Sequence, residues 1–367
     1  MGLLSRVGRA TARREGQSPR IDPLVDPIGA ADQAEEHGLL LEAMDLLIEA
    51  NRRNPSPEVE MRLLLARHRA YEALATEPGR PDWPPQVPDL TPDVVGIPEI
   101  DRADLTVEVL ASAVVHHGSL LVRGMLKPDH VDHLRHIIDQ AFTNYDAWDQ
   151  DGIDPAPDNP WFKLFIPEGD HAEQHETMAR GWVREAGGVS TADSPRGLFE
   201  FLEILDDCNV RGVLNEYFGE RPAISAKKNT LRRVPTNLWL SDWHQDGAFL
   251  GEGIRALNVW LSLTQCGGDT DVPGLDIVPR RMEEVLATGT EGAIFNWSVG
   301  RGLVDPILAE TPPVRPQFEP GDALLFDDLL LHSTAIPEQK IGAERYAVES
   351  WFFAPSHYPG KEVPLVF

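Results

Sequence analysis

Apolar residues recur every three to four positions from about Ala31 to Ala75, which is the spacing of one buried face of a helix. Ser56 followed by Pro57 is typical of a helix start, with a capping hydroxyl and a proline in the first turn. The pattern predicts a helical hairpin over residues 31–77 that packs as a brace against the rest of the chain. Its inward positions are expected to be Leu39, Leu40, Met44, Leu47 and Ile48 in the first helix, and Met61, Leu64, Leu65, His68, Tyr71 and Leu74 in the second.

The segments on either side of this hairpin lack a helical pattern. Residues 1–30 are rich in arginine but lack the apolar core and cleavage site of a secretory signal, so we expect a disordered basic lead-in. Residues 78–98 contain seven prolines, which cannot sustain a helix and favour an extended linker. The main domain is therefore expected to comprise residues 99–367.

Within the main domain, helical spacing gives way to short extended runs. Helices are predicted over residues 105–117, 128–142, 194–205 and 210–218, with a strand at Ser119–Arg123. After Pro222, short apolar runs alternate with turn residues, as in an all-β barrel or jelly roll. The pattern predicts an α+β fold with a barrel core at about residues 222–356. Its strands are expected near residues 227–233, 258–263, 275–279, 293–297, 323–326 and 346–353.

Residues 144–193 form a long stretch rich in Asp, Gly and Pro, with aromatic residues at Trp148, Trp161, Phe162 and Trp182. Long irregular segments in compact domains are commonly lids or binding loops. We predict that this stretch covers the mouth of a binding site, although an ordered surface excursion explains it equally well. His171 and His175 lie four residues apart, but no third ligand accompanies them, so a second metal site is not expected.

Charge and cysteine content narrow the functional classes. The 367-residue chain has 33 Lys and Arg against 59 Asp and Glu, a formal charge of −26, which disfavours nucleic-acid and anionic-membrane partners. Lys228, Thr230 and Arg232 would share one strand face. They would either contact an anionic substrate or co-substrate or lie solvated on an edge strand.

Two cysteines and no long apolar run predict a cytoplasmic protein without a disulfide framework or membrane span.

His244, Asp246 and His332 are the candidate metal ligands. Residues two apart in a strand point to the same side, so His244 and Asp246 can meet one ion if Trp243–Gly247 is extended. Two histidines and one carboxylate suit non-haem Fe(II) and leave positions open for a co-substrate and dioxygen. A His-x-Asp triplet also occurs where the two side chains are merely hydrogen-bonded to each other.

The residues around His332 strengthen this prediction. Pro320-Gly321-Asp322 is a turn signal, and the apolar run Ala323–Phe326 after it has the length of a buried strand. Arg345 enters a second apolar run thirteen residues after His332. A guanidinium inside a barrel requires an anion, and it matches a carboxylate in a two-pronged way. The spacing would therefore let one strand hold the metal and its neighbour hold the far carboxylate of a 2-oxo acid.

Four motifs stand out from about Asp101 onward: Trp243–Gly247, Ala256–Leu263, Pro320–Phe326 and the His332 to Arg345 pair. In these motifs the chain resembles the phytanoyl-CoA dioxygenase family of Fe(II)/2-oxoglutarate-dependent oxygenases. The resemblance implies a double-stranded β-helix, a jelly-roll or cupin-like barrel, braced by helices. Many relatives carry a Pro-Gly-Ser-His run where this chain has Arg280 and Arg281, so the substrate contacts of that loop are not carried over.

The same resemblance implies roles for individual residues. His244, Asp246 and His332 would bind iron, and Arg345 would bind the distal carboxylate of 2-oxoglutarate. Three further residues, Gln245, Trp260 and Thr334, would line the co-substrate. Strict strand alternation turns Gln245 away from the metal, so its role requires the strand to end there.

The implied reaction uses Fe(II), 2-oxoglutarate and dioxygen to hydroxylate an unactivated carbon, or to desaturate it, with release of succinate and CO2. Related halogenases replace the carboxylate ligand with a small residue, and Asp246 therefore favours hydroxylation over halogenation. The expected substrate is a small molecule, and Lys228, Arg232, Arg280 and Arg281 favour an anionic one.

Two other functional classes remain open. One is a cupin-like metal-dependent isomerase or hydrolase that does not use 2-oxoglutarate, and the other is a degenerate barrel kept for binding. Arg345 discriminates between these and the oxygenase, because a hydrolase has no evident need for a buried cation at that spacing. A nucleophile elbow, a dinucleotide-binding glycine fingerprint and a Cys-x-x-Cys pair are all missing from the sequence.

Overall fold

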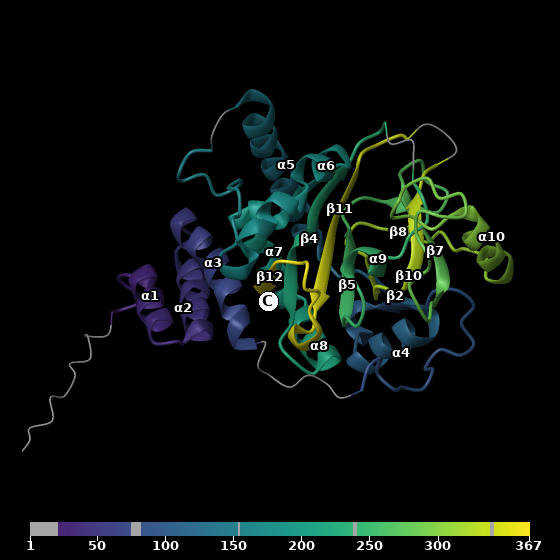
Figure 1. Ribbon diagram of the computed structural model, residues 1–367, viewed down its shortest axis with the longest axis horizontal. Helices are drawn as coiled ribbons and strands as arrows, with labels where there is room; N and C mark the ends of the chain where they lie inside the picture. Colours follow the sequence, from purple (N-terminus) through teal and green to yellow (C-terminus); the bar gives the residue numbers. More distant parts are fainter. Residues whose placement is uncertain (1–20, 75–81, 153–154, 238–240, 338–340) are drawn as a thin grey trace, which may run out of the picture.

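The computed structural model describes residues 21–74, 82–152, 155–237, 241–337 and 341–367. Three helices, where two were predicted, precede the main domain: α1 (Pro27–Glu36), α2 (Leu40–Arg53) and α3 (Pro57–Leu74). The extra helix begins where the Asp26 side chain accepts a hydrogen bond from the Gly29 amide. Figure 1 shows these helices at one end of the molecule and α10 (Arg301–Glu310) at the other.

The third helix joins this bundle to the main domain. Its buried Arg67 donates a hydrogen bond of 2.7 Å to the carbonyl of Val366, which lies in β12 (Pro364–Val366). Phe199, from α7 (Pro195–Asp207), is buried among the apolar side chains of the bundle. The three helices thus pack against the main domain, as expected of a brace.

The helices of the main domain start close to the predicted positions. They are α4 (Val107–His117), α5 (Pro128–Asp151), α7 and α8 (Val210–Phe218). Gly118 ends α4 in the left-handed conformation, with φ of 80°. Helix α5 continues past Phe142 because Tyr145 and Trp148 extend its apolar face and pack against Phe162.

The predicted lid is more ordered than expected. It contains the end of α5, the 3-10 helices η2 (Gly169–Met178) and η3 (Thr191–Asp193), α6 (Arg180–Glu185) and β3 (Gly188–Ser190). Phe162 and Phe165 are buried in the core between the large sheet and its helices. The prediction of a long irregular segment was therefore wrong over much of its length, and its role as a lid stays a prediction.

The large sheet has the strand order β1-β2-β9-β5-β11-β4-β12, with β3 paired to β4. Apolar residues on one face, such as Val348 and Phe352, pack under α4, α5, α7 and α8. Residues on the other face, such as Trp351, belong to a second apolar cluster. The remaining bounds are β1 (Glu99–Asp101), β2 (Ser119–Arg123), β4 (Ala223–Val234), β5 (Ala256–Ser262), β9 (Ala323–Phe326) and β11 (Arg345–Phe353), with η1 (Arg102–Asp104) after β1 and η4 (Pro355–His357) after β11.

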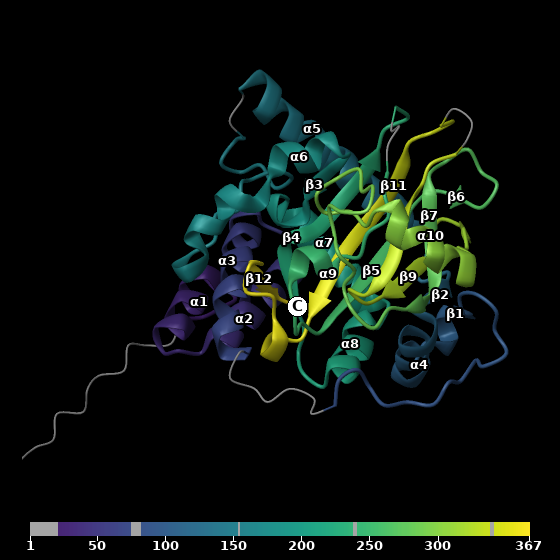
Figure 2. The ribbon, with the colours of Figure 1, turned by 45° about the vertical axis from the view of Figure 1, so that its right-hand side comes forward.

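Two small sheets lie on the side of the large sheet away from α5 and α7, and α4 packs beside β7 (Gly274–Arg281), as seen in Figure 2. In one small sheet, β10 (Leu330–Ala335) runs antiparallel to β7, and in the other β6 (Cys266–Gly267) pairs with β8 (Gln317–Phe318). Leu275, Ile277 and Leu330 share one apolar cluster with Trp351 of the large sheet. The molecule is thus a mixed α/β protein whose sheets enclose a common core, consistent with a jelly roll.

The prediction of a strand over residues 293–297 was wrong. This segment is a loop of turns and bends before α10, and the short helix α9 (Gly247–Leu250) lies after Asp246. Arg301 opens α10 and pairs with Asp305 at the surface. None of the helices in the described ranges is both long and apolar enough to span a membrane.

Candidate metal centre

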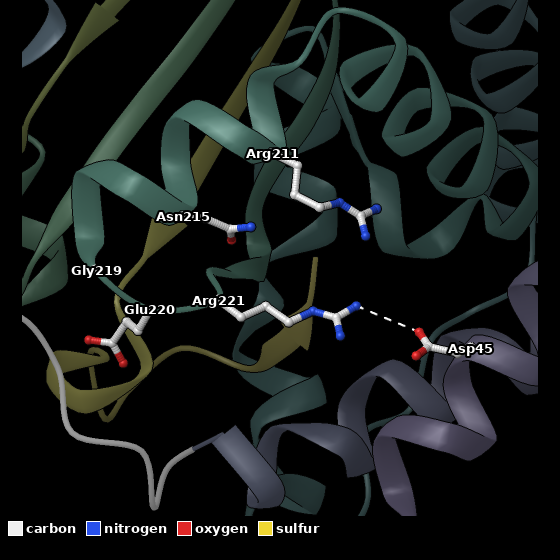
Figure 3. Close-up of a pocket in the computed structure, with 6 residues that line it drawn as sticks. All are labelled: Asp45, Arg211, Asn215, Gly219, Glu220 and Arg221. Carbon is white, nitrogen blue, oxygen red and sulfur yellow. Dashed lines mark ion pairs between the residues drawn. The ribbon is translucent and has the colours of Figure 1, made fainter. Parts of the chain in front are cut away.

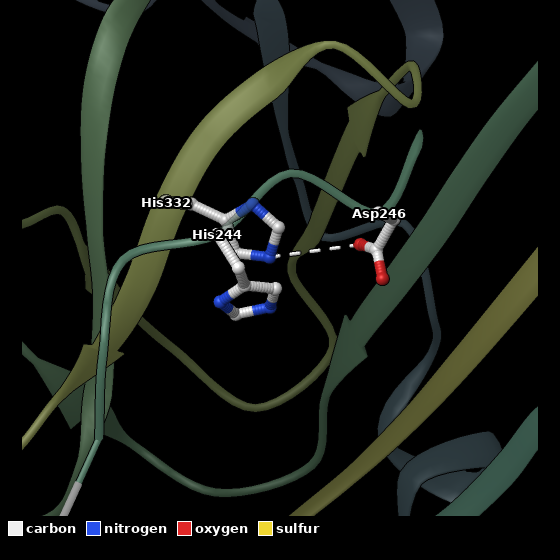
Figure 4. A group of neighbouring side chains, drawn as sticks. All are labelled: His244, Asp246 and His332. Carbon is white, nitrogen blue, oxygen red and sulfur yellow. Dashed lines mark ion pairs between the residues drawn. The ribbon is translucent and has the colours of Figure 1, made fainter. Parts of the chain in front are cut away.

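His244, Asp246 and His332 lie together although they are remote in sequence (Figure 4). One ligand atom of each residue lies within 4.8 Å of the others. His332 Nε2 is 3.7 Å from Asp246 Oδ2, and the two imidazole ring centres are 4.3 Å apart. No other group of three or more metal-ligating side chains occurs in the part of the chain that the structure describes. Two imidazoles and a carboxylate are a donor set that fits ferrous iron.

Backbone hydrogen bonds bring the two histidines side by side. The His244 amide donates to the His332 carbonyl at 2.9 Å, and the His332 amide donates to the His244 carbonyl at 3.0 Å. Among the described residues, this single antiparallel bridge is the only strand pairing that His244 makes. Asp246 has helical backbone angles and starts α9, so the two ligands do not occupy alternate positions of a continuous strand. The predicted convergence is present, but a strand ending in a helical turn produces it.

Both imidazoles are oriented through Nδ1. His244 Nδ1 lies 3.1 Å from the Asp242 carbonyl, and His332 Nδ1 lies 3.0 Å from the Leu330 carbonyl. Because a carbonyl only accepts, each Nδ1 carries a proton, and Nε2 is the nitrogen of each ring that can face a metal. Burial, together with the nearby His332, lowers the pKa of His244 to about 4. His244 is therefore neutral at physiological pH, as a ligand must be.

Arg345 is a buried cation at the start of β11. Its Nη1 donates to the carbonyls of Pro273 and Gly274, both at 3.2 Å, while its Nε has no hydrogen-bond partner among the described residues. Burial lowers the pKa of Arg345 below its ordinary value. An incompletely bonded, desolvated guanidinium fits a carboxylate ligand, because an anion would satisfy both the charge and the open donor.

The other three predicted co-substrate residues have different surroundings. The Trp260 ring centre is 5.7 Å from the Arg345 guanidinium, and Thr334 follows His332 by two positions on β10. Gln245 differs from the prediction, because its side-chain amide hydrogen-bonds to the backbone of other segments. Its Nε2 donates to the carbonyls of Glu284 and Leu329, and its Oε1 accepts from the Leu286 amide. Gln245 therefore anchors neighbouring loops.

Most of the cations that favoured an anionic substrate are paired with carboxylates. Arg232 pairs with Glu349 at 2.8 Å, Arg280 with Glu310 at 3.6 Å, and Arg281 with Asp327. Burial alone would raise the pKa of Glu349, but Arg232 and then Lys228 hold it below its usual range. Lys228 differs from the arginines, since its Nζ lies 4.1 Å from the Phe249 ring centre and no carboxylate of the described residues pairs with it.

Asp242 is a structural residue of the site that the sequence did not reveal. Its carboxylate accepts hydrogen bonds from the Ile294 amide at 2.9 Å and from the Ser298 hydroxyl at 2.6 Å. These bonds hold the loop that was predicted as a strand, and its Trp297 ring lies 5.4 Å from the His244 ring. An acidic residue two positions before the first histidine carries no recognisable motif, so only the folded structure identifies this role.

A buried acidic residue lies on the other side of the ligand loop. The Asp328 carbonyl accepts a hydrogen bond from the Gly247 amide, directly after Asp246. Burial, and then the charge of Asp327, raises the pKa of Asp328 to about 7. Asp328 is thus partly protonated near neutral pH.

A cleft of about 580 Å³ lies elsewhere, between α2 and the end of α8 (Figure 3). It is lined by Asp45, Arg211, Asn215, Gly219, Glu220 and Arg221. Arg221 faces Asp45 at 3.8 Å. Two acidic and two basic side chains cancel, so the lining selects neither sign of ligand charge.

No model of a protein family matches the chain, and neither does any curated protein sequence. Solved structures show a distant likeness. EctD from S. alaskensis, described with 2-oxoglutarate and 5-hydroxyectoine, is 16% identical with a TM-score of 0.42, over 77% of this chain and 88% of EctD. The non-heme α-ketoglutarate-dependent carbocyclase SnoK is 12% identical with a TM-score of 0.44, over 70% and 86%.

The epimerase SnoN, described in complex with Fe3+, α-ketoglutarate and nogalamycin RO, is 13% identical with a TM-score of 0.44, over 67% of this chain and 83% of SnoN. At these low similarities we base the function on the residues of this chain alone.

Proposed function

We propose that this protein is an Fe(II)- and 2-oxoglutarate-dependent dioxygenase that hydroxylates an unactivated carbon of a small metabolite and releases succinate and CO2. The observation that carries the proposal is the combination of a His-Asp-His group, with ligand atoms within 4.8 Å, and a buried guanidinium whose Nε lacks a partner among the described residues. A metal site alone would not require Arg345, whereas a chelating diacid needs both.

In this proposal, His244, Asp246 and His332 hold ferrous iron, and Arg345 binds the far carboxylate of 2-oxoglutarate. Trp260 packs beside the guanidinium, and Thr334 offers a hydroxyl next to the metal ligands. With dioxygen, the bound iron and 2-oxoglutarate supply the oxidising power that converts a C–H bond to an alcohol. Asp246 keeps a carboxylate where a halide would otherwise bind, so hydroxylation or desaturation is expected, and efficient chlorination by the wild-type protein would contradict this.

We also propose that the barrel is a double-stranded β-helix. Strands β4, β11, β5 and β9 are consecutive neighbours in the large sheet, and β10 and β7 pair in a small one. Single bridges at His244 and at Val314 extend the small sheet on both sides. Four strands facing four is the arrangement expected of such a barrel.

Anaerobic reconstitution tests the proposal. Protein loaded with Fe(II) is titrated with 2-oxoglutarate by calorimetry, and succinate release is then scored against a metabolite panel in air. We expect His332→Ala to lose iron binding and succinate release while its circular dichroism and melting curve stay near those of the wild type. The control is His133→Ala, which removes a surface histidine paired with Glu200 and should retain both activities.

Two results would overturn the proposal. Undiminished iron binding by His332→Ala would remove that residue from the ligand set. Tight metal binding with no affinity for 2-oxoglutarate would favour a metal-dependent isomerase or hydrolase.

A further inference from the structure

We propose that Lys228 and the aromatic residues Phe249, Phe295 and Trp297 form the substrate subsite, and that it takes a molecule with a flat apolar part and a carboxylate. All four side chains are half-buried. The inference rests on the proposed function, because it assumes that the metal centre acts on the molecule bound beside it.

Among the described residues Lys228 makes no direct ion pair, and its charge acts on the Glu349 carboxylate only through space. The neighbouring Arg232 is already neutralised by Glu349, with both Nε and Nη2 on the same carboxylate oxygen. Within the described residues, Lys228 Nζ lies over the Phe249 ring at 4.1 Å and has no carboxylate in ion-pair range. An aromatic face holds an ammonium in place without using its hydrogen-bond donors. Those donors are free to bind an anionic group of a ligand.

The aromatic residues place this cation next to the metal ligands. Phe249 lies on α9, three residues after Asp246, and its ring centre is 6.4 Å from that of His244. The Trp297 ring lies 5.4 Å from His244 and 5.6 Å from Phe249. Phe295 stacks on Trp297 with ring centres 4.7 Å apart and planes only 4° from parallel. The three rings form one continuous aromatic wall beside His244.

Two of the three rings are carried by a loop that is hydrogen-bonded to Asp242. The loop that carries Phe295 and Trp297 is anchored at both ends to the Asp242 carboxylate, through the Ile294 amide and the Ser298 hydroxyl. Asp242 also orients the His244 ring through its carbonyl. A flat apolar group stacked on a fixed wall loses little additional freedom, and ring stacking favours planar ligands.

Lys228 and Arg345 start from distant points on one face of the large sheet. Arg345 pairs with Val234 across β11 and β4, and Lys228 precedes Val234 by six positions on the same face. At about 3.3 Å per residue, the two backbone positions are about 20 Å apart. The terminal carbons of 2-oxoglutarate are at most about 6 Å apart at about 1.5 Å per bond. Because the backbone separation exceeds the length of 2-oxoglutarate, we assign the anion at Lys228 to a second molecule, and the effect of Lys228→Met on 2-oxoglutarate binding tests this assignment.

Binding of 3-phenylpropionate to the full chain tests the subsite. Its dissociation constant is compared with those of the neutral 3-phenylpropanamide and of butyrate, anaerobically, with Fe(II) and 2-oxoglutarate present and again in metal-free protein. We expect the acid to bind at least about tenfold more tightly than either analogue. Lys228→Met should abolish the preference over the amide, and Trp297→Leu the preference over butyrate. Lys227→Gln, which changes the adjacent lysine bonded to the Lys361 carbonyl, should alter neither.

These binding measurements distinguish failure of the substrate subsite from failure of the proposed oxygenase function. Three results would overturn the subsite. The acid and the amide could bind equally, or the acid could show no measurable binding at millimolar concentration. The preference for the acid over the amide could also be unchanged in Lys228→Met. The subsite would also be overturned if Lys228→Met weakened only 2-oxoglutarate, because the lysine would then serve the co-substrate. If the wild-type protein shows the Lys228-dependent preference but binds neither iron nor 2-oxoglutarate, the subsite stands and the oxygenase proposal fails.

Discussion

The Asp242 carboxylate accepts a hydrogen bond of 2.6 Å from the Ser298 hydroxyl, 56 residues further along the chain. Since the Asp242 carbonyl also lies 3.1 Å from His244 Nδ1, one residue connects a metal-ligand candidate to the loop that carries Trp297. The position of the aromatic wall therefore depends on the same short segment as the position of the imidazole.

We predict that Asp242→Ala lowers the free energy of unfolding by about 2–4 kcal/mol, because the Trp243 amide, the Ile294 amide and the Ser298 hydroxyl lose a charged acceptor. Ser298→Ala should cost about 1–2 kcal/mol. Urea denaturation of both variants and of the double variant gives a double-mutant cycle, in which we expect a coupling energy of about 1 kcal/mol. Simple additivity of the two effects would show that the bond contributes nothing of its own.

A second prediction concerns Arg345. Arg345→Met should raise the half-saturating 2-oxoglutarate concentration at least about thirtyfold, since loss of one partner of a buried charge pair costs about 2–5 kcal/mol. The kinetics of succinate release measure it. Arg301→Met, at an exposed arginine paired with Asp305, is the matched control and should leave the value unchanged. An unaltered requirement in Arg345→Met would mean that the co-substrate carboxylate binds elsewhere.

A third prediction concerns Gly118 and stability. Gly118 has φ of 80°, and a Cβ there would lie 2.7 Å from the backbone of Arg280. Gly38 has φ of 75° with no atom within 4 Å of such a Cβ. Gly38→Ala should therefore lower the free energy of unfolding by about 1–2 kcal/mol, because alanine disfavours the left-handed conformation. Gly118→Ala should lower it further, because the Cβ also clashes. Equal losses in thermal unfolding would show that α4 moves away from β7 freely.

A fourth prediction concerns pH. The pKa of Asp328 is raised from 3.8 to about 7 by burial, so the folded state holds this proton more tightly than the unfolded state. Its contribution to stability is fully present below about pH 4 and is lost as pH rises through 7, at about 1.4 kcal/mol per pH unit. In metal-free protein, the free energy of unfolding of Asp328→Asn should depend less on pH between pH 4 and 7 than that of the wild type. Identical pH profiles in urea denaturation would contradict this.

The sequence predicted the elements whose signals are local. The helix from Val210 to Phe218 and the strands Ser119–Arg123 and Ala323–Phe326 have the expected bounds, because apolar periodicity and flanking turn residues are contained within each segment. Helix α5 ran on past Phe142 because its later apolar contacts, Tyr145 and Trp148, lie in a stretch that composition alone marked as irregular.

The sequence could not predict features that depend on distant contacts. Residues 293–297 are apolar enough for a strand, but hydrogen bonds to Asp242 hold Ile294 and its neighbours in a loop. Gln245 matches a family position, yet its amide is committed to the backbone of Leu286 and Leu329. The three ligand candidates could be named from spacing, whereas the aromatic wall beside His244 required Phe249 and Trp297 to be placed in space.

The paired amide bonds between His244 and His332 have a consequence for the proposed metal centre. Because main-chain bonds set the gap between the imidazoles, chelation should empty the centre without unfolding the sheet, and dialysis should refill it. Other divalent ions of similar radius would then compete for the same binding site. Discrimination in favour of iron would come from supply and from reducing conditions, rather than from the shape of the protein.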